Sequence, residues 1–207
     1  MRTVVITGAS GNLGRAVANA FAGDQLVLLD VKSGVDLLDQ ESVNAAVKKL
    51  ARVDVLCNIA GGFRMGSAVH ETSEKDWNFL MDLNARTVLN MSRAVVPLML
   101  KAGGGKIVNI GAFAAQKGVA QMGAYVASKS AVIRLTETMA AELREKNINV
   151  NCVLPTIIDT PENRAAMPDA DPKRWVAPQA LADVIVFLAS DAARAIHGAA
   201  VPVSGLS

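Results

Sequence analysis

Thr7-Gly8-Ala9-Ser10-Gly11-Asn12-Leu13-Gly14 follows a short apolar run, Val4–Ile6, and precedes an amphipathic segment. A glycine-rich turn between a strand and a helix lets a pyrophosphate approach the backbone, because glycine has no Cβ atom. The helix that follows would present free N–H groups and the positive end of its dipole to the same anion. The stretch therefore predicts a dinucleotide cofactor bound by Gly8, Ser10, Gly11, Asn12, Leu13 and Gly14.

Short apolar runs alternate with longer helical patterns along the rest of the chain. The runs are rich in Val, Ile and Leu and rarely alternate with polar residues, as in parallel strands covered on both faces. They are Val4–Ile6, Leu26–Leu29, Val53–Cys57, Lys106–Ile110, Asn149–Val153 and Ala200–Val203. The pattern predicts a doubly wound α/β Rossmann fold. We expect residues 1–207 to form one domain around a mostly parallel sheet of six to seven strands.

The segment after the second predicted strand is unusually short. Only Val31–Val35 separates Asp30 from Asp36, and one helix, at about residues 40–51, fits before the third apolar run. A parallel crossover requires a dozen or more residues. We therefore predict that the helix between strands two and three is shortened or missing, and that strand three is vestigial.

Composition excludes several classes of protein. A hydrophobic fraction of 51% excludes a disordered chain, and 21 basic against 19 acidic residues give a charge too small to indicate nucleic acid or membrane binding. Two cysteines, no signal peptide and no apolar run of about 20 residues favour a cytoplasmic protein with a small-molecule substrate. His70 and His197 lack partners at ligand spacing, so no metal site is expected.

The identity of the cofactor depends on Asp30, which ends the second predicted strand 22 residues after Gly8. A carboxylate at that position can accept both adenosine ribose hydroxyls and repels a 2′-phosphate. Val31 follows it, and no arginine stands there to hold a phosphate. The sequence therefore favours NAD(H) over NADP(H).

Tyr125 and Lys129 are four residues apart in a helical pattern, so their side chains share one face. An ammonium about 5 Å from the phenol, at an effective dielectric constant of about 20, would favour the phenolate by roughly 3 kcal/mol, or about 2 pK units. We therefore predict that Lys129 lowers the pKa of Tyr125. The tyrosine would then serve as proton donor to a substrate that receives a hydride.

Together these segments resemble the short-chain dehydrogenase/reductase family from end to end. The resemblance implies that Asn84 holds a proton-relay water and completes the catalytic set with Tyr125 and Lys129. Further cofactor contacts are implied at Val31, Asp36, Leu37, Asn58, Ala60, Gly61, Tyr125, Lys129, Pro155, Ile158 and Thr160, with Lys129 bonding the nicotinamide ribose. It also implies a homodimer or homotetramer formed through the helices at about residues 84–100 and 125–143.

The chain departs from the family pattern at Ala112, where a catalytic serine is expected; no Ser or Thr occurs from Lys106 to Tyr125. Losing one oxyanion donor costs about 2.7–4 kcal/mol. Dihydropteridine reductases, which this chain resembles in Asp159–Trp175, also lack that serine and reduce a delocalised quinonoid ring. The resemblance implies a substrate-side lid at residues 159–175 and substrate contacts at Gly62, Phe63, Ala112, Phe113, Tyr125, Met167 and Trp175.

Three interpretations of the function stay open. The protein reduces a quinonoid dihydropterin, acts on another carbonyl or alcohol substrate, or is an NAD(H)-binding regulator without turnover. Gln116, Gln121 or a water molecule could replace the missing serine hydroxyl.

Overall fold

A computed structural model describes all of residues 1–207. Six strands form one sheet in the order β2-β1-β3-β4-β5-β6, and every neighbouring pair is parallel. The strands are β1 (Thr3–Thr7), β2 (Gln25–Leu29), β3 (Val55–Asn58), β4 (Gly105–Ile110), β5 (Ile148–Pro155) and β6 (Ala200–Val203). The predicted α/β fold is confirmed. The order reverses between β1 and β3, and in such sheets ligands bind at that reversal.

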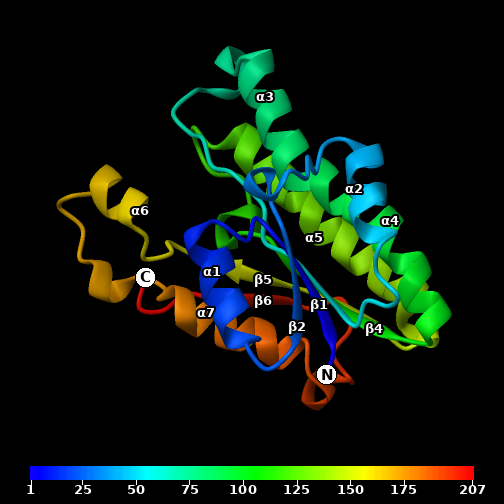
Figure 1. Cartoon of the computed structure of the whole chain (residues 1–207). Coiled ribbons are helices and arrows are strands. Elements are labelled where there is room, and N and C mark those ends of the chain that lie inside the picture. The colour runs from blue at the N-terminus through cyan, green and yellow to red at the C-terminus, as the bar shows by residue number, and fades with distance from the viewer.

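Helices cover both faces of the sheet (Figure 1). On one face, α1 (Asn12–Ala20) and α7 (Pro178–Leu188) pack together on the strands. On the other lie α2 (Gln40–Val47), α4 (Thr87–Ala102) and α5 (Gly123–Leu143), with α3 (Glu74–Met81) beside α5. The short α6 (Pro161–Ala166) projects at the margin of the molecule (Figure 1). None of these helices has the length and apolarity needed to cross a membrane.

The apolar spacing of α4 explains how it packs. Val88, Met91, Val95 and Met99 lie on successive turns of one face, and each is at most 2% exposed. This periodicity of three to four residues buries one stripe of the helix against the sheet. The packing of this stripe also positions residues 82–86, which directly precede α4 and include the candidate catalytic residue Asn84.

The connection between β2 and α2 is as short as predicted. A single 3-10 turn, η1 (Val31–Ser33), follows β2, and no strand lies between it and α2. Asp30 caps this turn, and Gly34 ends it with a φ of 80°, a left-handed conformation that suits glycine. The helix and strand expected to be shortened or vestigial are therefore absent, and β2 forms an edge of the sheet.

A π-helical turn, η3 (Asp82–Arg86), joins α3 to α4 without a break in the helix. Such a turn accommodates an additional residue and is common at functional sites. Within it Asn84 and Ala85 are buried, while Arg86 forms an ion pair with Asp82 on the outside. The turn thereby directs Asn84 toward the protein interior.

Candidate active site and cofactor cleft

A cleft of about 450 Å³ opens beyond the carboxyl ends of β1, β2 and β3. Most of the predicted cofactor contacts line it: Gly8, Ser10, Gly11, Asn12, Leu13, Gly14, Asp30, Val31, Asp36, Leu37, Ala60, Gly61 and Thr160. These residues come from five separate segments of the chain. The fold therefore brings together in one cleft residues that lie far apart in the sequence.

The glycine-rich loop has the close backbone packing that a phosphate cradle requires. A Cβ on Gly14 would lie 2.2 Å from the Gly8 carbonyl oxygen. Gly8 has a φ of 62°, and a Cβ there would lie 2.8 Å from the backbone of Ala60. Helix α1 begins after Gly11 with no side-chain cap and no acidic residue in its first turn. Its N-terminal N–H groups thus fit the pyrophosphate of a dinucleotide.

Asp30 lies at the end of β2 with its carboxylate fixed by three hydrogen bonds. It accepts from the Ser10 hydroxyl at 2.8 Å, the Ser10 amide at 3.2 Å and the Lys32 amide at 3.0 Å. The Lys32 amide, followed by the Ser10 donors, lowers the pKa of Asp30. No lysine or arginine lines the cleft itself, although the nearby Lys32 charge also lowers the pKa of Asp30 and Arg15 donates to Asn12 Oδ1 at 2.6 Å behind the cleft wall.

Five predicted cofactor residues do not line the cleft: Asn58, Tyr125, Lys129, Pro155 and Ile158. Asn58 is 3% exposed and donates to Asn109 Oδ1 at 2.8 Å, which ties β3 to β4. Pro155 is buried at the end of β5, and Ile158 bridges to Val176. Sequence reasoning missed four lining residues, each next to or within one turn of a predicted one: Leu38, Ile59, Leu83 and Thr87.

Two of the predicted catalytic side chains, those of Asn84 and Lys129, meet beneath Gly61. Lys129 is 5% exposed, and its Nζ donates to the Ile110 carbonyl oxygen at 2.8 Å. Asn84 is 1% exposed, with its amide directed at the loop after β3. A Cβ on Gly61 would lie 2.9 Å from Asn84 Oδ1 and 3.1 Å from Lys129 Nζ. Tyr125 stands one turn before Lys129 on α5.

The pKa values differ from the expectation for this pair. Burial raises the pKa of Tyr125 to about 12 and lowers the pKa of Lys129 to about 8. The prediction that Lys129 lowers the pKa of Tyr125 is therefore wrong, because desolvation alone determines the direction of the change. Both groups lose water, which disfavours each charged form, and Lys129 Nζ makes its hydrogen bond with Ile110.

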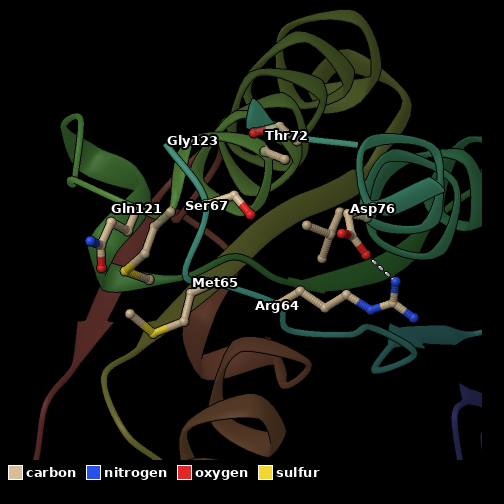
Figure 2. A pocket seen from close by; sticks show the side chains of 10 residues that line it. Arg64, Met65, Ser67, Thr72, Asp76, Gln121 and Gly123 are labelled. Atoms are coloured by element: carbon tan, nitrogen blue, oxygen red, sulfur yellow. Dashed lines mark hydrogen bonds and ion pairs between the residues drawn. The ribbon is translucent and has the colours of Figure 1, made fainter. Parts of the chain in front are cut away.

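The loop after β3 forms a wall beside Tyr125. The rings of Phe63 and Tyr125 meet edge to face, with centroids 4.8 Å apart and an interplanar angle of 84°. Arg64 pairs with Asp76 on α3, as Figure 2 shows, and its guanidinium lies 3.9 Å from the centre of the Phe79 ring. Phe63 was predicted as a substrate contact only through the family resemblance. In the structure its ring packs against the phenol ring of Tyr125.

A second attachment holds the same loop near the start of α5. The Gly66 amide donates to the Gln121 carbonyl oxygen at 2.8 Å, and Gln121 has a φ of 61°. Figure 2 shows Gln121 and Gly123 across from Met65 and Ser67 in a small pocket at this junction. The loop is thus fixed to both α3 and α5, so its wall beside Tyr125 is well defined.

The remaining predicted substrate residues are dispersed. Ala112 is 3% exposed, Phe113 is 43% exposed, and Met167 is half-buried. Gly62 packs so closely that its Cβ would lie 2.8 Å from Leu83. Trp175 is only 7% exposed, and it does not line the cofactor cleft. Its substrate contact stays a prediction.

Two side chains near Ala112 in the sequence make local hydrogen bonds. The Gln116 amide donates to the Phe113 carbonyl oxygen at 3.4 Å, and Ser130 donates to the Ala115 carbonyl oxygen at 2.9 Å. Gln121 contributes its backbone carbonyl to the loop contact. Which group replaces the missing serine hydroxyl therefore stays a prediction.

The predicted lid segment reaches the glycine-rich loop. Glu162 on α6 accepts from the Asn12 side-chain amide at 2.7 Å, which joins residues 150 positions apart. Within the segment, Arg164 forms a two-pronged pair with Asp159, and Thr160 caps α6. Residues 159–166 thus lie beside the cleft that Thr160 lines.

Comparisons with known proteins agree with this fold. A family model described as "Enoyl-(Acyl carrier protein) reductase" matches residues 2–205. "Dehydrogenase/reductase SDR family member 6" of Danio rerio is 34% identical, over 99% of this chain and 96% of that protein. The chain belongs to the short-chain dehydrogenase/reductase family and is an oxidoreductase of that type.

Two solved structures extend the comparison. A putative NAD(P)-dependent gluconate 5-dehydrogenase from Beutenbergia cavernae, with bound NADP at low occupancy, has a TM-score of 0.87 and 31% identity, covering 99% of this chain and 95% of that one. An NAD⁺-bound xylitol dehydrogenase has a TM-score of 0.89 and 26% identity, covering 99% of this chain and 98% of that one. The chain is similar to both over nearly its whole length.

Proposed function

We propose that this protein is an NADH-dependent reductase of a small conjugated substrate, with a quinonoid dihydropterin as the best candidate. The observation that carries the proposal is the site beneath Gly61, where Asn84 and Lys129 lie together beside the cleft, with Tyr125 one turn before Lys129 on α5 and Ala112 where a hydroxyl is expected. A delocalised, nitrogen-rich ring accepts hydride without forming a localised alkoxide. Such a substrate does not need the serine hydroxyl that is missing at Ala112.

The cleft supports a nicotinamide dinucleotide as the cofactor. The loop from Gly8 to Gly14 and the uncapped start of α1 would hold the pyrophosphate. Asp30 would accept the adenosine ribose hydroxyls, and its charge, with no cation on the cleft wall, supports NADH over NADPH. When bound, NADH supplies the hydride. The relatives whose names mention NADP and NAD⁺ are consistent with this class of cofactor.

The protein's own groups handle the proton. With a pKa of about 12, Tyr125 keeps its phenolic proton at neutral pH and can donate it from Oη to the reduced substrate. Lys129, with a pKa of about 8, is mostly an ammonium at pH 7 and would hold the ribose of the bound nicotinamide. Asn84 holds the adjoining loop, and Phe63 gives the substrate an aromatic wall.

The lid and the assembly follow as further parts of the proposal. Residues 159–175 would cover the bound substrate, which the contact from Glu162 to Asn12 supports.

Leu89 and Leu100 on α4 are 36% and 44% exposed, and such apolar positions support a homodimer or homotetramer.

A second substrate class is favoured by the relatives. The solved structures named for gluconate and xylitol point to oxidation or reduction at a secondary alcohol or ketone. The missing hydroxyl at Ala112 counts against this class, because a localised alkoxide would form next to an apolar side chain. Direct assay separates the two classes.

The test measures loss of NADH absorbance with a quinonoid dihydropterin generated in the cuvette, and formation of NADH from NAD⁺ with polyols. We expect turnover of the dihydropterin, faster with NADH than with NADPH. In Tyr125→Phe, turnover should fall by at least about 100-fold while NADH affinity changes little, since the proton donor is lost. Turnover of polyols alone would replace the first substrate with the second, and full activity in Tyr125→Phe would contradict the catalytic role.

A further inference from the structure

We propose that Ser128 is a positioning residue that holds the phenol of Tyr125 in register with the aromatic wall at Phe63. This proposal rests on the proposed function, in which Tyr125 is the proton donor. Ser128 lies on α5 between Tyr125 and Lys129 and is 0% exposed, so it cannot itself touch a substrate. Its influence must therefore pass through its hydrogen bonds.

Those hydrogen bonds connect two elements. The Ser128 hydroxyl accepts from Asn84 Nδ2 at 2.9 Å and donates to the Tyr125 carbonyl oxygen at 2.8 Å. Asn84 belongs to the π-helical turn η3, whereas Ser128 belongs to α5. No other α5 side chain hydrogen-bonds to Asn84. Ser128 thus sets the distance between the turn that carries Asn84 and the helix that carries Tyr125.

Asn84 passes the constraint on to the loop after β3. Its Oδ1 accepts from the Gly62 amide at 2.8 Å, and its Nδ2 also donates to the Gly62 carbonyl oxygen at 3.1 Å. The next residue, Phe63, lies edge to face with Tyr125 at 4.8 Å between ring centroids. A closed circuit therefore runs from Tyr125 through Ser128, Asn84 and Gly62 to Phe63 and back to the Tyr125 ring.

Burial makes this circuit rigid. Asn84 is 1% exposed, so water cannot replace the Ser128 hydroxyl when that hydroxyl is removed. Gly62 has little room to adjust, since a Cβ there would already meet Leu83 at 2.8 Å. Without Ser128, the Asn84 amide keeps only its bonds to Gly62. Asn84 then no longer connects the loop after β3 to α5. Phe63 and Tyr125 would then sample a wider range of separations.

The composition of the chain offers a direct probe, because Tyr125 is its sole tyrosine. Protein labelled with ¹³C in the tyrosine ring gives the signals of this residue alone in an NMR spectrum. The neighbouring Phe63 ring displaces these signals from those of free tyrosine. A change in the packing of the two rings is therefore visible without any substrate or cofactor.

The experiment compares Ser128→Ala and Ser128→Cys with Ser130→Ala in the full-length protein. Ser130 is the matched control: it also lies on α5, but its hydroxyl donates to the Ala115 carbonyl oxygen. We expect the tyrosine ring signals to move toward those of free tyrosine in Ser128→Ala, to move less in Ser128→Cys, and to stay in place in Ser130→Ala. Cysteine is included because it matches serine in shape and keeps a weak donor.

Kinetics supply the second readout. In Ser128→Ala we expect kcat to fall about 10-fold, the effect of losing one well-placed hydrogen bond. The affinity for NADH should stay within about twofold, because the circuit does not include the glycine-rich loop or Asp30, which would hold most of the cofactor. Unmoved ring signals in Ser128→Ala, or equal movement in Ser130→Ala, would overturn the proposal. Movement of the signals without turnover of any substrate would uphold the positioning role and refute the proposed reaction.

Discussion

Replacing Lys129 with methionine should change how the stability of the protein depends on pH. The Lys129 ammonium is 5% exposed, and burial lowers its pKa from 10.5 to about 8. In the unfolded chain the lysine returns to its ordinary pKa, so the unfolded state binds more protons between pH 8 and 10.5. At about 1.4 kcal/mol for each pH unit, the buried charge costs about 3 kcal/mol at neutral pH.

The direction of the effect follows from that difference. Below pH 8 the folded protein bears the whole cost of the buried ammonium, and above pH 10.5 it bears none. Wild-type stability should therefore rise with pH across this window relative to Lys129→Met. Methionine keeps an unbranched apolar chain in the same space but carries no charge, so the variant lacks this contribution.

The measurement is urea unfolding, followed by tryptophan fluorescence at pH 7 and pH 10. From pH 7 to pH 10, the free energy of unfolding should increase by about 2 kcal/mol more in the wild type than in Lys129→Met. Lys101→Met, the same change on the exposed side of α4, is the control and should track the wild type. If the curves of Lys129→Met and wild type run parallel, the lysine is not a desolvated ammonium and the reasoning fails.

Three further predictions concern other parts of the site. Gly14→Ala should weaken NADH binding at least about 10-fold and lower stability in urea, because the new Cβ would lie 2.2 Å from the Gly8 carbonyl oxygen; unchanged binding would show that the loop can relax. Asp30→Asn should reduce the preference for NADH over NADPH by about 10-fold in fluorescence titrations, since it removes the charge that repels a 2′-phosphate. Cys57 and Cys152 should resist thiol reagents in the native protein and react only on unfolding, because burial raises their thiol pKa values to about 12 and about 11; rapid native labelling would contradict this.

Local patterns in the sequence were sufficient to predict the sheet and most of the residues that line the cleft. The glycine-rich loop, the apolar strand runs and Asp30 each depend on spacing within one segment. The missing helix after β2 was also predictable, since chain length alone excludes a crossover there. These features follow from backbone geometry and periodicity, both of which a single sequence records.

The catalytic side was harder to predict because it depends on burial and on contacts between distant segments. The spacing of Tyr125 and Lys129 predicted that they share one helix face. It did not predict their burial, which raises the pKa of the tyrosine where a decrease was expected. The substrate contact of Trp175 was predicted by resemblance alone and stays a prediction. The role of Ser128 became visible only once Asn84, 44 positions away, was seen to donate to it.

The π-helical turn at Asp82–Arg86 determines how far α4 is rotated about the helix axis relative to α3. Each residue of an α-helix advances the chain by about 100° around its axis. Deleting one residue of the turn would therefore rotate all of α4 by about 100° relative to α3, with every other residue unchanged. The stripe from Val88 to Met99 would then face away from the sheet, or Asn84 away from Ser128. In this region the number of residues is as tightly constrained as their chemical identity.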